Sequence, residues 1–248
     1  MRSMQIVCGF SLLIALASSP VAVADPSWAK VEGHLYNVTS TNADNLSNPY
    51  SASQVMAYGA FPDVETGEVF VSASASTLDS SALAQTATLD VYVSTKSTPH
   101  SLLGVEIPSA GSAAQEWEFT AAQDGFVTFN ALLDYHVDLM TSGSGEYAGG
   151  WFLARIGIAT TGYSDWQYSS FGTLHQEVYD GDDFSESLST TLSVTSLSAF
   201  HAGETGYLGM DMTVLTEAWA NTVVPLPPAL LLGLLGMGAA GLKLRKYT

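Results

Sequence analysis

The sequence predicts an all-β domain, an antiparallel β-sandwich of jelly-roll-like topology, placed between an N-terminal signal peptide and a C-terminal transmembrane helix. Two observations predict the sandwich. Apolar residues recur at every second position in several segments, a pattern that places one face of a strand on a core and the other in water. Glycine, serine and aspartate separate these segments, and the amphipathic helices that an α/β fold needs are not evident.

The first 24 residues have the three-part layout of a secretory signal peptide. Arg2 is followed by an apolar run at 6–17 and by small residues at Ala22 and Ala24, so cleavage is expected after Ala24. The alternative is a transmembrane anchor, but the run is well short of the roughly 20 residues that a span needs. The single cysteine, Cys8, lies in this segment, so the mature protein cannot form a disulfide and depends on its core.

Residues 25–222 form the predicted ectodomain, which has about the length of one domain. Period-two alternation marks strands at 69–75, 87–93, 127–139 and 208–220. A single turn of helix is expected at 80–85, before the strand at 87–93. Segments 184–194 and 207–219 are expected to form the closing pair of strands of the sandwich.

This ectodomain is strongly acidic. It holds all 24 acidic residues of the chain but only three of the seven basic ones, so its net charge is −21, against −17 for the whole chain with histidines neutral. A surface of this charge repels nucleic acid, which argues against DNA or RNA binding, and it attracts divalent cations. The aromatic content and the alternating segments argue against disorder.

A proline-rich segment, a short apolar run and a basic end follow one another at the C-terminus. They are Val224, Pro225, Leu226, Pro227 and Pro228, then 229–242, then Lys243, Arg245 and Lys246. Prolines suit the start of a helix, and a transmembrane helix is predicted over about 226–242, with the basic residues anchored in the cytoplasm. The alternative is a buried helix of a soluble fold, which the uniformly apolar surface and the three terminal cations disfavour.

Residues 223–248 resemble the PEP-CTERM class of bacterial sorting signals, in its VPLPA variant. The motif is matched at 224–227, while Pro228 stands where the variant has alanine. The resemblance implies that a membrane-embedded transpeptidase of the exosortase type recognises the tail and cleaves it near Pro227. The ectodomain would then pass from the inner membrane to the cell surface or to the exopolysaccharide matrix of a biofilm. The resemblance covers the tail and implies no activity for the ectodomain.

The ectodomain sequence shows no recognised catalytic motif. It has no Gly-x-Ser-x-Gly elbow, no phosphate-binding glycine loop and no cysteine nucleophile, the groups by which common hydrolases and nucleotide enzymes are identified. We therefore expect a protein that is not an enzyme. A secreted hydrolase is the alternative, with Glu116 and Glu118 as its carboxylate pair, because they share one strand face around Trp117.

The densest acidic cluster is a candidate calcium site. Asp180, Asp182 and Asp183 lie on a loop with Gly181, and their carboxylates could supply several of the six to eight oxygens that calcium takes. Their order does not match an EF-hand loop, so the alternative is a solvated acidic loop. No other cofactor is expected.

Asp134, His136 and Asp138 are a second candidate ligand group, because they alternate along the predicted strand 127–139. Residues two apart on a strand point the same way at a spacing of about 7 Å, which is too wide for one metal without a neighbouring strand. The alternative is a solvated polar strand face.

Five aromatic residues gather within about twenty positions: Trp151, Tyr163, Trp166, Tyr168 and Phe171. We expect them in the core, because a domain without disulfides needs large buried side chains. If they are exposed instead, they offer flat faces to sugar rings. A calcium- or carbohydrate-binding module of the exopolysaccharide matrix is therefore the second hypothesis for the ectodomain.

Overall fold

A computed structural model describes residues 27–99, 105–160 and 165–220, which belong to one unit. These residues form strands and no helix, so the predicted all-β class and the two antiparallel sheets of a sandwich are confirmed. Within these three ranges no helix occurs that could span a membrane. The predicted signal peptide and sorting tail, with the expected helix at about 226–242, lie outside the described residues.

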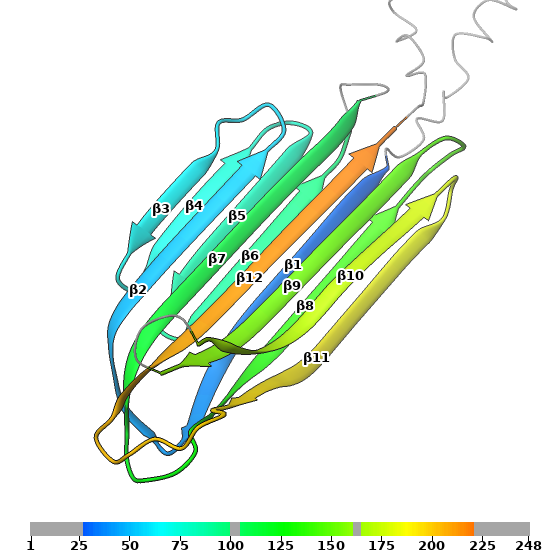
Figure 1. Ribbon diagram of the computed structural model, residues 1–248. Coiled ribbons are helices and arrows are strands. Elements are labelled where there is room, and N and C mark those ends of the chain that lie inside the picture. The colour runs from blue at the N-terminus through cyan, green and yellow to red at the C-terminus, as the bar shows by residue number, and fades with distance from the viewer. Residues whose placement is uncertain (1–26, 100–104, 161–164, 221–248) are drawn as a thin grey trace, which may run out of the picture. The chain divides into compact units, whose positions relative to one another are not determined.

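Two antiparallel sheets of six strands each, sheet A and sheet B, make up the described part of the chain (Figure 1). Sheet A has the order β11-β8-β1-β6-β5-β4, with β1 (Trp28–Thr41), β4 (Val71–Ser76), β5 (Ser80–Ala87), β6 (Asp90–Ser97), β8 (Thr128–Met140) and β11 (Asp183–Thr195). Sheet B has the order β10-β9-β12-β7-β2-β3, with β2 (Ala43–Ala57), β3 (Asp63–Gly67), β7 (Glu106–Ala121), β9 (Tyr147–Ala159), β10 (Gln167–Tyr179) and β12 (Thr205–Trp219).

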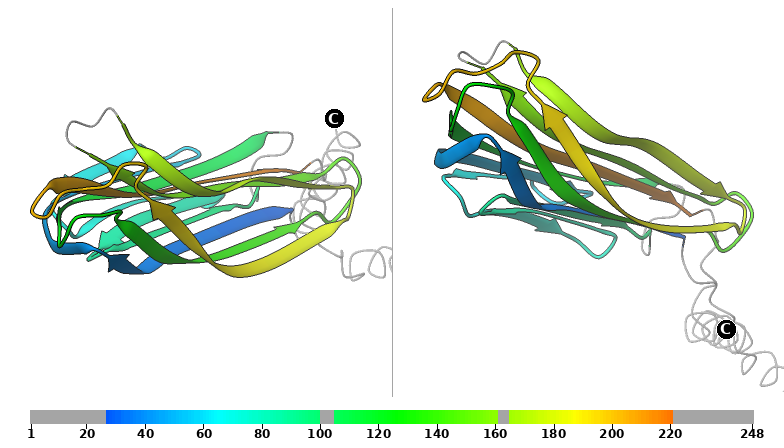
Figure 2. Two further views of the ribbon diagram at one scale, coloured as in Figure 1. Left: turned by 60° about the horizontal axis from the view of Figure 1, so that its bottom comes forward. Right: turned by 90° about the horizontal axis from the view of Figure 1, so that it is seen from below.

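The sheets pack face to face. β1 and β6 of sheet A contact β12 of sheet B, and β5 contacts β7; the two layers are seen lying over one another in Figure 2. Hairpins join β2 to β3, β4 to β5, β5 to β6 and β9 to β10, while every other link between consecutive strands passes from one sheet to the other. Strands that are neighbours in a sheet are therefore mostly distant in sequence.

The strongest alternating segments form central strands, as predicted. In β8 every inward side chain, from Phe129 to Leu139, is at most 3% exposed. In β12 the inward series includes Thr216, which breaks the apolar pattern in the sequence but is fully buried. Its hydroxyl bonds that of Ser97 across the core at 2.9 Å, which satisfies both polar groups inside the sandwich.

Two local predictions are wrong. Residues 80–85 do not form a helical turn but belong to β5, in which Ala82 and Ala84 face the core. The predicted strand at 87–93 contains the turn between β5 and β6, where Leu89 has a φ of 53°. The apolar residues on either side of this turn belong to two antiparallel strands, whose combined pattern imitates one longer strand.

The closing segments are strands, but they do not pair with each other. β11 pairs with β8 at the edge of sheet A, whereas β12 lies between β7 and β9 in sheet B. The link between them passes from one sheet to the other. The expectation of a closing strand pair is therefore wrong, although both strands exist.

The core between the sheets is built on aromatic contacts. Phe119 of sheet B meets Phe129 of sheet A with ring centroids 5.1 Å apart, and Phe152 meets Tyr135 at 4.9 Å. Gly33 of β1 faces this core, and a Cβ built on it would collide with Phe152 and Met212. Glycine at position 33 therefore lets the two sheets approach closely beneath the central strands.

Candidate functional site

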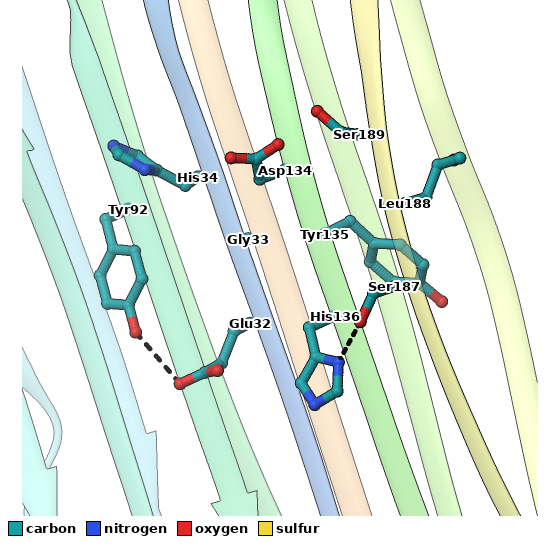
Figure 3. A pocket seen from close by; sticks show the side chains of 10 residues that line it. All are labelled: Glu32, Gly33, His34, Tyr92, Asp134, Tyr135, His136, Ser187, Leu188 and Ser189. Carbon is teal, nitrogen blue, oxygen red and sulfur yellow. Dashed lines mark hydrogen bonds between the residues drawn. The ribbon is translucent and has the colours of Figure 1, made fainter.

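A groove with a volume of about 480 Å³ crosses the outer face of sheet A (Figure 3). Strands β6, β1, β8 and β11 contribute side chains to it because their register aligns outward-facing residues in two rows. The rows are Tyr92–His34–Asp134–Ser189 and Ser94–Glu32–His136–Ser187. We call these residues the sheet A groove.

In the first row, Asp134 is held by hydroxyl groups. It accepts hydrogen bonds from Ser189 and, at 2.8 Å, from the Tyr36 hydroxyl, and these bonds place the pKa of its carboxyl below the ordinary value. His34 stacks on Tyr36 with ring centroids 4.3 Å apart and bonds Asp90 through Nε2 at 2.9 Å. Asp134 is therefore ionised at neutral pH and already partnered.

In the second row, Glu32 has the largest set of partners. Lys30 forms an ion pair with it at 2.9 Å, and the hydroxyls of Tyr92 and Ser94 each donate to it at 3.2 Å. Partial burial alone would raise the pKa of Glu32, but the bond to Lys30, its charge and the two hydroxyls lower the pKa below the ordinary value. The carboxylate is thus held charged by its neighbours.

His136 and Ser187 form the one contact in the groove that resembles part of a catalytic triad. His136 Nδ1 and the Ser187 hydroxyl are 2.8 Å apart. Among the residues that the structure describes, no carboxylate bonds the other ring nitrogen of His136, and Glu32, the nearest candidate by register, is turned towards Tyr92 (Figure 3). A serine nucleophile needs an oriented base, so this geometry does not favour acyl transfer.

The residues of the second candidate ligand group share one strand face, as predicted. Asp134 and His136 line the groove, whereas Asp138 lies one step further along β8, opposite Lys30 and Ser185. Asp134 is bonded by the hydroxyls of Tyr36 and Ser189, and His136 is bonded to Ser187. In the described ranges no three His, Cys, Asp or Glu side chains gather closely enough to hold a metal ion.

The predicted calcium cluster lies at the turn between β10 and β11. Asp180 has a φ of 56° and accepts a hydrogen bond from the Gly145 amide at 2.6 Å, which docks this turn on the loop between β8 and β9. The Asp182 carbonyl accepts from Thr141, and Asp183 begins β11. The side chains of Asp182 and Asp183 thus do not join Asp180 around a common point.

Glu116 and Glu118 share the outer face of β7, and Trp117 between them points into the core, where it is 7% exposed. Glu118 accepts a hydrogen bond from the Asn48 side chain at 2.5 Å. Trp117 therefore presents no exposed ring beside the two carboxylates.

The aromatic group is divided between the core and the surface. Phe171 packs on the core near Tyr135 and Phe152. Trp166 and Tyr168 instead lie on the outer face of sheet B, with ring planes 15° apart and centroids 5.7 Å apart, against glycines of β9 and β12.

Two further features complete this aromatic surface. The Arg155 guanidinium lies 5.0 Å from the Tyr168 ring centroid and bonds Asp211 at 2.8 Å. Trp151 is half-buried on the same outer face, opposite Leu215. The interpretation of the group as core is therefore wrong for Trp151, Trp166 and Tyr168, while Tyr163 lies outside the described residues.

A second cavity, of about 660 Å³, lies at the end of sheet B where β7 and β9 begin and β10 and β12 end. Five of the residues that line it are acidic: Glu106, Glu146, Glu177, Asp180 and Glu217. We call this the sheet B acidic cavity. The sequence alone does not reveal this cavity, because its residues come from separate strands and loops. Of these residues only Asp180 belongs to a candidate site predicted from the sequence.

The sites predicted at the two ends of the chain lie outside the described residues: Ala22 and Ala24 at the signal cleavage point, 224–228 in the sorting motif, and the basic residues Lys243, Arg245 and Lys246. Comparison with known proteins adds no relative, since no protein-family model matches the chain and a search of the curated proteins finds no significant match.

Proposed function

We propose that the chain is an exported bacterial cell-surface or extracellular-matrix protein without enzymatic activity, sorted and cleaved by an exosortase at its C-terminal motif. One observation carries this proposal. The strands fill the interval between the two predicted signals, because β1 begins at Trp28, four residues after Ala24, and β12 ends at Trp219, five residues before Val224.

The two ends of the sandwich also lie together. The Ser27 hydroxyl donates a hydrogen bond to the Trp219 carbonyl at 3.1 Å. Cleavage after Ala24 and near Pro227 would leave every described strand intact, because the first of them begins at Trp28 and the last ends at Trp219. A domain whose packed elements stop short of both processing points is what an exported and sorted cargo requires.

The surface chemistry suits this destination. With a net charge of −21 over residues 25–222, the ectodomain is repelled by anionic surfaces and is kept soluble by like-charge repulsion. The jelly-roll-like topology, which the many crossings between sheets favour, remains part of the same proposal.

The sorting step is tested in the native host. We expect mass spectrometry of the released protein to find a C-terminus near Pro227, and Pro225→Ala or Pro227→Ala to leave full-length protein in the membrane fraction. Pro62→Ala, in an exposed loop, is the matched control and should be released normally. A released wild-type protein that keeps residues 243–248 would refute the proposal.

A second candidate function is carbohydrate binding, and the sheet A groove favours it. Carboxylates, imidazoles and hydroxyls line its floor beside the stacked pair His34 and Tyr36. Such polar groups bond sugar hydroxyls, and aromatic faces pack against sugar rings. Calcium binding by the turn at Asp180 remains the other form of this hypothesis.

Titration with an uncharged matrix polysaccharide tests the second candidate. If the groove binds it, Tyr92→Ala should weaken binding at least 5-fold, whereas Tyr50→Ala, exposed on β2, should not. Equal affinity in Tyr92→Ala and wild type would exclude the groove. For calcium, the absence of a rise in the unfolding temperature at millimolar concentration would count against a site at Asp180.

A further inference from the structure

The sheet B acidic cavity is built from two rows of outward side chains, like the groove, but with different chemistry. The first row is Glu106–Trp219–Tyr147–Tyr179, and the second is Pro108–Glu217–Gly149–Glu177. Gly149 has no side chain, and the Tyr147 ring leans over it. The rows therefore leave a hollow with carboxylates on two sides and aromatic rings at its end.

These carboxylates have few cationic partners. Among the described residues no lysine or arginine lines the cavity, and His175, bonded to Glu177 at 2.5 Å, is the nearest basic group in the structure's hydrogen-bond network. Glu217 bonds Glu106, and the Tyr147 hydroxyl reaches Glu217 at 3.5 Å. Burial, followed by the bond to Glu106 and its charge, raises the pKa of Glu217.

Glu146 adds to this cavity a buried carboxylate that is only partly satisfied. It lines the cavity and is 1% exposed. One carboxylate oxygen, Oε2, accepts from the Ser142 amide at 2.6 Å, the Ser142 hydroxyl at 2.9 Å and the Gly143 amide at 3.0 Å. The other, Oε1, has no partner among the described residues, although a buried carboxylate oxygen left unpaired is costly.

The shape of the cavity distinguishes between cations. A metal ion needs several ligands around one point, and no such group occurs among the described residues. Here the carboxylates are spread through a volume of about 660 Å³ beside Trp219 and the pair Tyr147 and Tyr179, whose ring centroids are 5.2 Å apart. Aromatic faces and carboxylates together suit an amine on a body with apolar faces.

We propose that this cavity binds a ligand carrying protonated primary amines on a partly apolar body, the chemical class of amino sugars with a free amine and of polyamines. The ammonium group bonds Glu106 and Glu217 in place of the proton that they share, and that proton leaves to solvent. The ring of the ligand or its methylene chain packs on Tyr147 and Trp219. The binding of such a ligand goes beyond the proposed export and sorting, and either proposal can be refuted without the other.

Binding is therefore expected to release protons and to strengthen as the pH rises through the raised pKa of Glu217. The other titratable groups that face this pair are Glu146 and Asp180 from the loops, Tyr147 from β9, and His175, Glu177 and Tyr179 from β10.

Calorimetric titration of the full-length chain in non-ionic detergent tests this proposal. The probes are a fully deacetylated glucosamine pentamer, its N-acetylated counterpart, spermidine and calcium chloride, each at pH 6 in two buffers of different ionisation enthalpy. We expect the deacetylated pentamer or spermidine to bind with proton release, and the N-acetylated pentamer to bind at least 10-fold more weakly. The amine probe that binds more tightly shows whether the ligand is an amino sugar or a polyamine.

Variants locate the site. Glu217→Gln should weaken amine binding at least 10-fold and abolish proton release. Glu106 is exposed, and Glu106→Gln should have the same two effects. Glu65→Gln, on exposed β3, makes the matched change and should bind like wild type. Equal weakening in Glu65→Gln would show a general charge effect, and equal binding of the N-acetylated probe, binding of calcium alone or no binding would each overturn the proposal.

Discussion

The sheet A groove and the sheet B acidic cavity have the same architecture and opposite electrostatics. Each consists of two rows of outward side chains across four neighbouring strands, β6, β1, β8 and β11 in the groove and β7, β12, β9 and β10 in the cavity. In the groove, hydroxyls and Lys30 lower the pKa of Glu32 and Asp134. In the cavity, burial and a neighbouring carboxyl raise the pKa of Glu217. The carboxylates of the groove are bonded by hydroxyls and Lys30, whereas Glu217 in the cavity has another carboxyl, Glu106, as its partner.

This difference indicates which of the two surfaces would gain more from binding a ligand. A ligand in the groove must compete with existing hydrogen bonds, so its net gain per bond is small. A cation in the cavity would neutralise repelling carboxylates and displace a proton.

The groove depends on the core beneath it. Gly33→Val would place a branched side chain against Phe152 and Met212, and overpacking of this kind costs about 3 kcal/mol of unfolding free energy. Chemical denaturation measures the loss. Gly143→Val, where nothing lies within 4 Å of an added Cβ, should change stability by less than about 0.5 kcal/mol. Equal losses in both variants would contradict the close contact at Gly33.

A partnered carboxylate should stabilise the fold. The lowered pKa of Glu32 means that its stabilisation is present above the ordinary pKa and is lost as the pH falls through the lowered one. We expect Glu32→Gln to cost about 1 kcal/mol at pH 7, reduced by its partial exposure. Below the lowered pKa the difference should vanish. Urea denaturation across pH measures this, and a pH-independent difference would count against the ion pair with Lys30.

A carboxylate that is bonded to another carboxyl should do the opposite. With its pKa raised in the folded state, Glu217 binds its proton more tightly when folded, so stability falls as the pH rises from the ordinary value towards the raised one. Glu217→Gln should therefore stabilise the protein at pH 7 by about 0.5 kcal/mol, allowing for solvent screening. The gain should disappear at acid pH. A loss of stability at pH 7 would indicate that Glu217 has a cationic partner.

Ser187 and His136 should not catalyse ester hydrolysis. Both side chains are exposed in their hydrogen bond, so Ser187→Ala should change the unfolding free energy by less than about 0.5 kcal/mol. Wild type and variant should show equal background turnover of activated esters. If the wild-type protein hydrolyses them and the variant does not, the non-enzymatic assignment fails.

The central strands could be predicted from the sequence because a single period runs through them. β8 and β12 are themselves uninterrupted and have a neighbouring strand on each side, so their inward and outward faces differ consistently. β1 and β2 could not, because each is interrupted by bulges. Asn37 and Asn45, both with a φ of 52°, lie where the register shifts. Each bulge shifts the alternation by one or more residues and hides the pattern.

The candidate sites were harder to predict from the sequence than the strands were. Asp134 and His136 could be placed on one face of a strand, but Glu32 and Tyr92 join them only through the register of β1 and β6. The exposure of Trp166 and Tyr168 depends on the glycines of β9 and β12 beneath their rings. The cavity unites Glu106 with Glu217, more than a hundred residues away. Such pairings depend on topology, which local sequence does not encode.

The hydrogen bond between Ser27 and Trp219 has a mechanical consequence. Tension applied to the chain beyond Trp219 pulls along β12, which is bonded to β7 over 15 residue pairs and to β9 over 13. Fluid drag on a tethered molecule would thus shear both ladders together instead of unzipping one bond at a time.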